Sequence, residues 1–146
     1  MQYSFHTLKN TRHMKRILFI MLSALIMTAC GSSNSDKEQA RQMLAAEAIA
    51  TNNQLQGMQI DFATKSDGCE FKDDIFHYYY TVYEEYVTIE ALEACKEERK
   101  EAIVGFLESS EETKEMIRLM RSINGKFIYH YTGSESGKCS DIIIEF

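Results

Sequence analysis

Two histidine–carboxylate pairs are the side chains of this chain that could transfer protons or hold a metal ion. His77 is expected opposite Glu70 on one pair of strands, and His130 opposite Asp141 on another. A neighbouring carboxylate favours the charged imidazole and raises its pKa. A metal or proton-relay site built from all four groups requires that the two strand pairs lie side by side. Otherwise each pair is an ordinary cross-strand polar contact.

Four cysteines supply the thiols of the chain. Cys30 ends an apolar segment near the N-terminus, and Cys69, Cys95 and Cys139 follow. An oxidising compartment would allow one disulfide among the last three and would leave one thiol over. Cys69 and Cys95 are both expected to point toward the core, which favours a Cys69–Cys95 bridge. A Cys69–Cys139 bridge and three reduced thiols remain open as alternatives.

Residues 1–29 have the parts of a secretory signal peptide. Lys15 and Arg16 are basic, the 13 residues of Ile17–Ala29 are apolar or small, and Cys30 follows. This stretch is shorter than the roughly 20 residues that span a bilayer, which argues against a retained membrane helix. Residues 1–13 show no organised pattern, and we expect translation to start at Met14.

The sequence Met27-Thr28-Ala29-Cys30 resembles the lipobox of bacterial lipoproteins, with Met at a position where Leu is more usual. The resemblance implies that the Cys30 sulfur is diacylated, that the leader is removed before it and that the new N-terminus is acylated. In enterobacteria an Asp directly after this cysteine signals retention at the inner membrane. Gly31 stands there, so the resemblance implies the outer membrane of a Gram-negative bacterium. Residues 58–82 are also similar to domains of unknown function in small lipoproteins of such bacteria, which implies no activity.

The part of the chain after the leader is strongly acidic. Four of the 16 basic residues and none of the 22 acidic residues lie in residues 1–29, so the remainder carries 12 basic and 22 acidic residues, a net charge of −10. Such a domain repels nucleic acid and anionic membrane surfaces, and neither is expected as a partner. The expected membrane contact is the lipid anchor alone.

The sequence predicts no cofactor, no resident metal and no catalytic residue. It contains no Gly-rich phosphate loop, no His-Glu-x-x-His, no Gly-x-Ser-x-Gly and no calcium loop. It also lacks a Cys-x-x-Cys motif, and no cation is placed to lower the pKa of Cys139.

Three amphipathic helices are predicted from the spacing of apolar residues and from capping signals. Ser35 and Glu38 form a capping box at the start of the first, which follows a flexible tether over 30–35. The helices are expected over 36–51, 89–107 and 110–122.

Two β-hairpins account for most of the remaining ordered residues. The first joins 69–72 to 75–83 through Asp73-Asp74, and the second joins 126–132 to 139–145 through a four-residue loop over 134–137. A one-residue slip would mix apolar and polar residues on both faces of the second hairpin. The facing pairs are then Cys69–Tyr78, Glu70–His77, Phe71–Phe76, Lys126–Glu145, Ile128–Ile143, His130–Asp141 and Thr132–Cys139.

These elements predict an α+β two-layer sandwich. Their order is α-β-β-α-α-β-β, with a fifth strand near Met58 as an alternative. Hairpins give antiparallel pairing, and three amphipathic helices need one apolar sheet face to cover. We therefore predict an antiparallel sheet of four or five strands with three helices, forming a single domain over 36–146.

The face of this sheet that points away from the predicted core is unusually apolar. It carries Ile75, Tyr79, Tyr83, Ile128 and Ile143 at alternating positions. Either the first helix crosses this face, or the face binds a partner. The leading hypothesis is a non-enzymatic, lipid-anchored envelope protein that binds a protein or peptide there, through Tyr79, Ile128, His77, His130 and Asp141. The alternative is an envelope enzyme or metal-binding protein that uses His77, His130 and Asp141. A purely structural envelope protein without a ligand is a third hypothesis.

Overall fold

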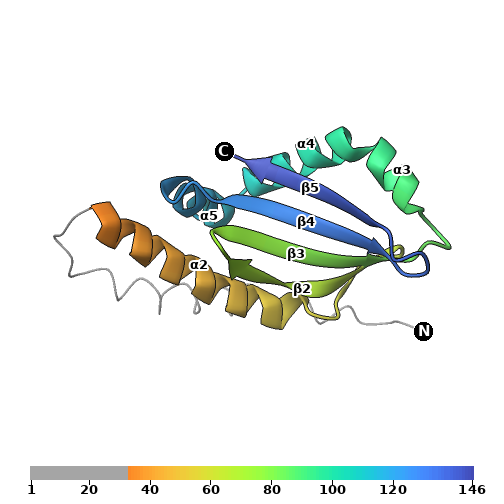
Figure 1. Cartoon of the computed structure of the whole chain (residues 1–146), viewed down its shortest axis with the longest axis horizontal. Helices are drawn as coiled ribbons and strands as arrows, with labels where there is room; N and C mark the ends of the chain where they lie inside the picture. The colour runs from red at the N-terminus through yellow and green to blue at the C-terminus, as the bar shows by residue number, and fades with distance from the viewer. Residues whose placement is uncertain (1–32) are drawn as a thin grey trace, which may run out of the picture. The chain divides into compact units, whose positions relative to one another are not determined.

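The sheet of this protein has five strands in the order β1-β2-β3-β4-β5, as described by a computed structural model of residues 33–146 (Figure 1). The predicted signal peptide and the predicted lipidation site, Cys30, lie outside the described residues. The strands are β1 (Gln59–Asp61), β2 (Thr64–Lys72), β3 (Ile75–Val82), β4 (Lys126–Gly133) and β5 (Cys139–Glu145). The fifth strand that was an alternative near Met58 is therefore present, as β1.

One pair of strands corrects the prediction of an antiparallel sheet. β3 and β4 pair in parallel, whereas the other three pairs are antiparallel. All the helices that follow β3 lie between these two strands in the chain, so the connection is a crossover. A crossover carries the chain back to the end of the sheet where β3 begins, and β4 then runs in the same direction as β3.

Four helices are described, one more than expected. They are α2 (Ser33–Leu55), α3 (Ile89–Ala94), α4 (Lys96–Leu107) and α5 (Glu111–Ser122). The predicted helix over 89–107 is interrupted at Cys95, and α2 begins inside the segment expected to be a tether. The predicted capping box at Ser35 does not start α2, which begins at Ser33. Two other helices begin at side-chain caps: Thr88 Oγ1 accepts a hydrogen bond from the Ala91 N–H, and Ser110 Oγ accepts one from the Thr113 N–H.

Both hairpin registers predicted from the sequence are confirmed. In the first, Phe71 pairs with Phe76 and Glu70 with His77; in the second, His130 pairs with Asp141. The first hairpin turns through Asp73 and Asp74, which both have positive φ angles (53° and 62°). Such a turn matches the twist of the two strands and fixes their register.

The described helices pack on one face of the sheet and leave the other face open. Ala40, Leu44 and Ala48 of α2 join a single buried core with residues of α4 and α5. In Figure 1, α2 runs along the β2 side of the sheet and α3 and α4 run along the β5 side. The sheet contributes Phe76, Tyr78, Val82, Phe127, Tyr129, Tyr131, Ile142 and Ile144 to this core. The first helix therefore does not cross the opposite face. None of the described helices is long and apolar enough to cross a membrane.

The predicted Cys69–Cys95 disulfide is absent from the described residues, where both cysteines are free thiols. Cys69 is buried on β2, and its Sγ lies 3.4 Å from the Ala48 carbonyl oxygen of α2. Burial raises the pKa of its thiol to about 11. Cys95 is exposed and follows α3, which contacts β4 and β5. The expectation that Cys95 points toward the core is therefore wrong, and β3 lies between Cys69 and the strands that α3 contacts.

Two polar contacts attach α2 to β2 and its turn. Arg41 donates two hydrogen bonds of 2.8 Å to the Asp74 carboxylate. Asn52 Oδ1 accepts a hydrogen bond of 2.9 Å from the Cys69 N–H. Gly68, the residue before Cys69, has a φ of 114°, and a Cβ at Gly68 would collide with Asn52 Oδ1.

We expect Gly68→Ala to lower the free energy of unfolding by about 3 kcal/mol, through backbone strain and loss of the Asn52 contact. Gly57→Ala is the matched control, because Gly57 also has positive φ (78°) but has open space around it. Its cost should be about 1 kcal/mol, from backbone strain alone. Urea denaturation measures both. Equal losses in the two variants would show that Asn52 does not clamp α2 to β2.

Candidate functional site

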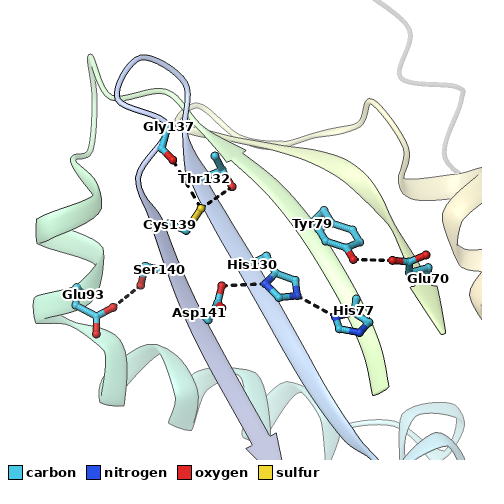
Figure 2. Close-up of polar contacts among 10 residues, drawn as sticks. All are labelled: Glu70, His77, Tyr79, Glu93, His130, Thr132, Gly137, Cys139, Ser140 and Asp141. Carbon is cyan, nitrogen blue, oxygen red and sulfur yellow. Dashed lines mark hydrogen bonds and ion pairs between the residues drawn. The ribbon is translucent and has the colours of Figure 1, made fainter. Parts of the chain in front are cut away.

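The candidate site is the open face of the sheet, where side chains from three neighbouring strands meet (Figure 2). The parallel register places His77 of β3 beside Ile128 of β4, and Tyr79 of β3 beside His130. The antiparallel register of β4 and β5 places Asp141 beside His130. The structure therefore brings the predicted residues together. It does so because the two hairpins lie side by side, which the sequence left open.

Three aromatic rings lie close to one another on this face. The ring centroids of His77 and Tyr79 are 6.0 Å apart, those of Tyr79 and His130 5.0 Å, and those of His77 and His130 5.2 Å. The three planes are inclined to one another by only 9° to 14°. The two imidazoles meet through ring nitrogens 2.9 Å apart, so they contact edge to edge and not face to face.

A hydrogen-bonded line runs across β3, β4 and β5. Nδ1 of His77 lies 2.9 Å from Nε2 of His130, and Nδ1 of His130 lies 2.9 Å from Oδ1 of Asp141. When His130 donates from Nδ1 to the carboxylate, its unprotonated Nε2 accepts a hydrogen bond from the Nδ1–H of His77. Only one proton fits between the two imidazoles. A proton on Nε2 of His130 would remove the acceptor and break this hydrogen bond, whereas a proton on Nε2 of His77 would leave it in place.

The pKa of His77 corrects an expectation from the sequence. Burial lowers the pKa of His77 below its ordinary value of 6.5, and the charge of His130 lowers it further. Glu70 acts in the opposite direction but is a smaller influence. Its carboxylate instead accepts a hydrogen bond of 2.7 Å from the Tyr79 hydroxyl. Burial, followed by this hydrogen bond, raises the pKa of Tyr79 to about 12.

Two isoleucines add an apolar surface beside the rings. Ile128 is buried between its strand neighbours His77 and Ile143, and Ile143 is 41% exposed. Cys139 and Thr132 lie further along the same face, where Sγ and Oγ1 are 3.5 Å apart. Apolar, aromatic and hydrogen-bonding groups are thus available together to a partner that lies on this face.

The arrangement of the histidines differs from that of a metal centre. Within residues 33–146 no group of three or more His, Cys, Asp or Glu side chains is placed to hold a metal ion. His77 and His130 direct ring nitrogens at each other, and Asp141 occupies the other nitrogen of His130. The predicted residues therefore form a line of hydrogen bonds, with no common point for a cation.

A pocket beside α2 was not predicted from the sequence. A pocket of about 260 Å³ opens between α2 and β2, with Ala45, Ala48 and Ile49 on the helix side and Cys69 and Phe71 on the strand side. It forms because α2 leaves part of the β2 side of the sheet uncovered. The alternation of β2 placed Phe71 toward the helices, but no local signal located α2 beside it.

Comparisons with known proteins identify the fold. No protein-family model matches the chain, and no curated protein matches it. A Pseudomonas aeruginosa protein provisionally described as secreted is similar in structure, with a TM-score of 0.62 and 9% identity over 75% of this chain and 92% of that one. The pilotin EpsS of the Vibrio vulnificus type 2 secretion system is similar with a TM-score of 0.58 and 10% identity, over 77% of this chain and 93% of that one. At such identities the likeness shows a shared α+β fold.

The lowered pKa of His77 predicts a stability that depends on pH. Because the unfolded state takes up the proton first, stability is full above the unfolded pKa near 6.5 and is lost as pH falls through the folded pKa. We expect a lower melting temperature at about pH 5.5 than at about pH 7.5, and a smaller difference in His77→Gln. Histidine NMR titration checks the assignment: the His77 midpoint should rise toward 6.5 in His130→Gln. A His77 midpoint above 6.5 in the unmodified protein would contradict it.

Proposed function

We propose that this protein is a lipid-anchored protein of the Gram-negative cell envelope that binds another protein or a peptide through the open face of its sheet. The observation that carries the proposal is the composition of that face. It holds the rings of His77, Tyr79 and His130 beside two isoleucines, while the described helices pack on the opposite face.

The open face has the chemistry of a binding surface. A partner that covered Ile143 and the edge of the ring cluster would remove apolar area from water, at about 25 cal/mol per Å². Tyrosine is frequent among the residues that dominate protein interfaces because it combines a large ring with a hydroxyl group. The carboxylates of Glu70 and Asp141 lie at the two sides of the cluster and accept hydrogen bonds, which would orient a partner.

The proposed location follows from the leader and is compatible with the fold. The segment ending at Cys30 resembles a lipobox, and Gly31 after it favours the outer membrane. One protein of similar fold is a pilotin of a type 2 secretion system and another is described as secreted. These likenesses support an envelope protein whose partner belongs to the same compartment, and a secretion-system protein is the first class to test.

A second candidate function is an envelope enzyme or metal-binding protein. The hydrogen-bonded line through His77, His130 and Asp141 favours it, because such a line moves a proton or fixes the tautomer of an imidazole. A metal ion would need further ligands from a substrate or partner, since residues 33–146 offer no group of three. Binding through the open face needs no such addition and is therefore the first candidate.

Lipidation is tested with the intact protein in its host. We expect globomycin to cause accumulation of the uncleaved precursor, and the purified mature protein to begin with an acylated Cys30. Cys30→Ala should prevent both cleavage and membrane attachment, whereas Cys139→Ala, the control, should leave them unchanged. Mass spectrometry that found an unmodified Cys30 thiol on a cleaved chain would contradict the anchor.

The binding face is tested by photo-crosslinking in intact cells. We expect a crosslinker at Tyr79 to capture one defined envelope protein. Ile143→Asp in the same chain should weaken that capture at least tenfold, about 1.4 kcal/mol, because it places a charge in the covered face. Ile143 is partly exposed, so the variant should still fold. Phe106→Ser, an exposed aromatic on α4, is the matched control and should not change capture. Equal capture by Ile143→Asp and the unmodified chain would contradict this role of the open face.

A further inference from the structure

A second exposed apolar surface lies away from the ring cluster. Four large apolar side chains have between 42% and 73% of their surface exposed. They are Met58 before β1, Ile60 in β1, Phe62 in the turn after β1 and Tyr86 in the loop after β3. We call these four residues the distal patch. The rings of Phe62 and Tyr86 contact each other at a centroid separation of 5.5 Å and an angle of 84°. Exposed apolar side chains that form one patch mark an interaction surface, whereas single scattered ones are ordinary.

The distal patch lies between two helix ends. Met58 follows the end of α2, and its N–H donates a hydrogen bond of 2.9 Å to the Leu55 carbonyl oxygen. Tyr86 precedes Thr88, the N-cap of α3. The stretch of α2 over 36–55 is about 30 Å long, at 1.5 Å per residue. The patch is therefore at the end of α2 opposite to the end that follows Cys30.

Hydrogen bonds hold the distal patch in a defined shape. Asp61 Oδ1 accepts a bond of 2.8 Å from the Ala63 N–H in the turn that carries Phe62. The Ala63 carbonyl oxygen accepts a bond of 2.8 Å from the Tyr83 N–H, which connects this turn to the end of β3. A partner would find the two rings already placed, so less conformational entropy is lost on binding.

The charge around the distal patch selects among occupants. Residues 57–67 and 83–88, which frame it, carry four acidic side chains and one basic side chain. The last turn of α2 contains no basic residue, so the negative end of the helix dipole is not compensated there. An anionic lipid surface would be repelled. A partner with Lys or Arg beside its apolar side chains would be attracted.

The segment before α2 cannot reach the distal patch once the leader is removed. On the proposed function, Cys30 becomes the first residue, and only Gly31 and Ser32 separate it from α2. Three extended residues span roughly 10 Å, which is far less than the length of α2. On the proposed anchoring, the leader is thus excluded as the occupant.

We propose that the distal patch binds a segment of a second envelope protein in which apolar side chains are flanked by Lys or Arg. This proposal rests on the proposed anchoring at Cys30, which excludes the leader as occupant, but does not depend on the open face. The anchor end of α2 then faces the bilayer, and the opposite end carries the docking surface.

The test uses the full lipidated protein in nanodiscs of zwitterionic lipid, with empty nanodiscs subtracted. The probes are two synthetic peptides of equal length, one of leucine and lysine and one of leucine and glutamate. We expect the lysine peptide to bind at least tenfold more tightly. Phe62→Ser and Tyr86→Ser should each weaken it at least tenfold, and both side chains are exposed enough for the variants to fold. Phe106→Ser, at 67% exposure, is the matched control and should bind like the unmodified protein.

Several outcomes would overturn the proposal. Equal loss in Phe106→Ser would show general stickiness, and equal binding of the two peptides would remove the role of charge. A dimer abolished by Phe62→Ser would identify a second copy as the occupant, and Phe62-dependent binding to phosphatidylglycerol vesicles would identify lipid. If the cleaved protein binds the lysine peptide and the uncleaved Cys30→Ala variant does not, the leader would be identified as the occupant. If Ile143→Asp loses the cellular partner while Phe62→Ser keeps peptide binding, the distal patch fails and the open-face function stands.

Discussion

The parallel pairing of β3 with β4 is the constraint on which the candidate site depends. It puts Tyr79 beside His130 and His77 beside Ile128, so that side chains from two separate hairpins share one surface. An antiparallel pairing of the same strands would reverse β4 and separate these neighbours. The crossover through α3, α4 and α5 imposes the parallel direction, and α3 and α4 contact the β4 and β5 part of the sheet. The connection thus determines both the neighbours within the site and the face on which the site is left open.

Local features of the sequence predicted more of this fold than long-range ones. Both hairpin registers were correct because alternation along each strand and a short turn fix them within a few residues, as Asp73 and Asp74 show with their positive φ angles. The sequence did not predict the parallel pairing of β3 and β4, because no residue in either strand indicates which strand lies beside it. The Cys69–Cys95 bridge is absent partly for the same reason: Cys69 is buried on β2 as expected, but Cys95 is exposed at the end of α3, which contacts β4 and β5.

The sequence identified residues that the structure brings together, but it did not indicate the direction of the His77 pKa shift. His77, His130 and Asp141 do come together, as the pattern allowed. The sequence expectation assigned His77 a partner carboxylate and a raised pKa. In the structure Glu70 bonds to Tyr79, and the nearest group to His77 is a second imidazole. Burial and that neighbour lower the pKa. The direction of the His77 pKa shift depends on where the side chains point and on which residues of the next strand lie beside them. Neither can be obtained from a pairing register alone.

The lowered pKa of His77 bears on what the open face can recognise. A neutral His77–His130 pair shares one proton, and its rings are held nearly coplanar by that bond and by Asp141. A partner that covered the face would remove water from the pair, and desolvation disfavours the charged imidazole further. Binding and protonation therefore oppose each other: a contact that excludes water disfavours the charged form of His77 and strengthens the hydrogen bond between the neutral rings. A catalytic relay needs His77 to exchange protons freely with solvent or substrate, whereas a recognition surface needs the rings to stay fixed. The stabilised neutral state, together with the Tyr79 hydroxyl committed to Glu70, suits recognition.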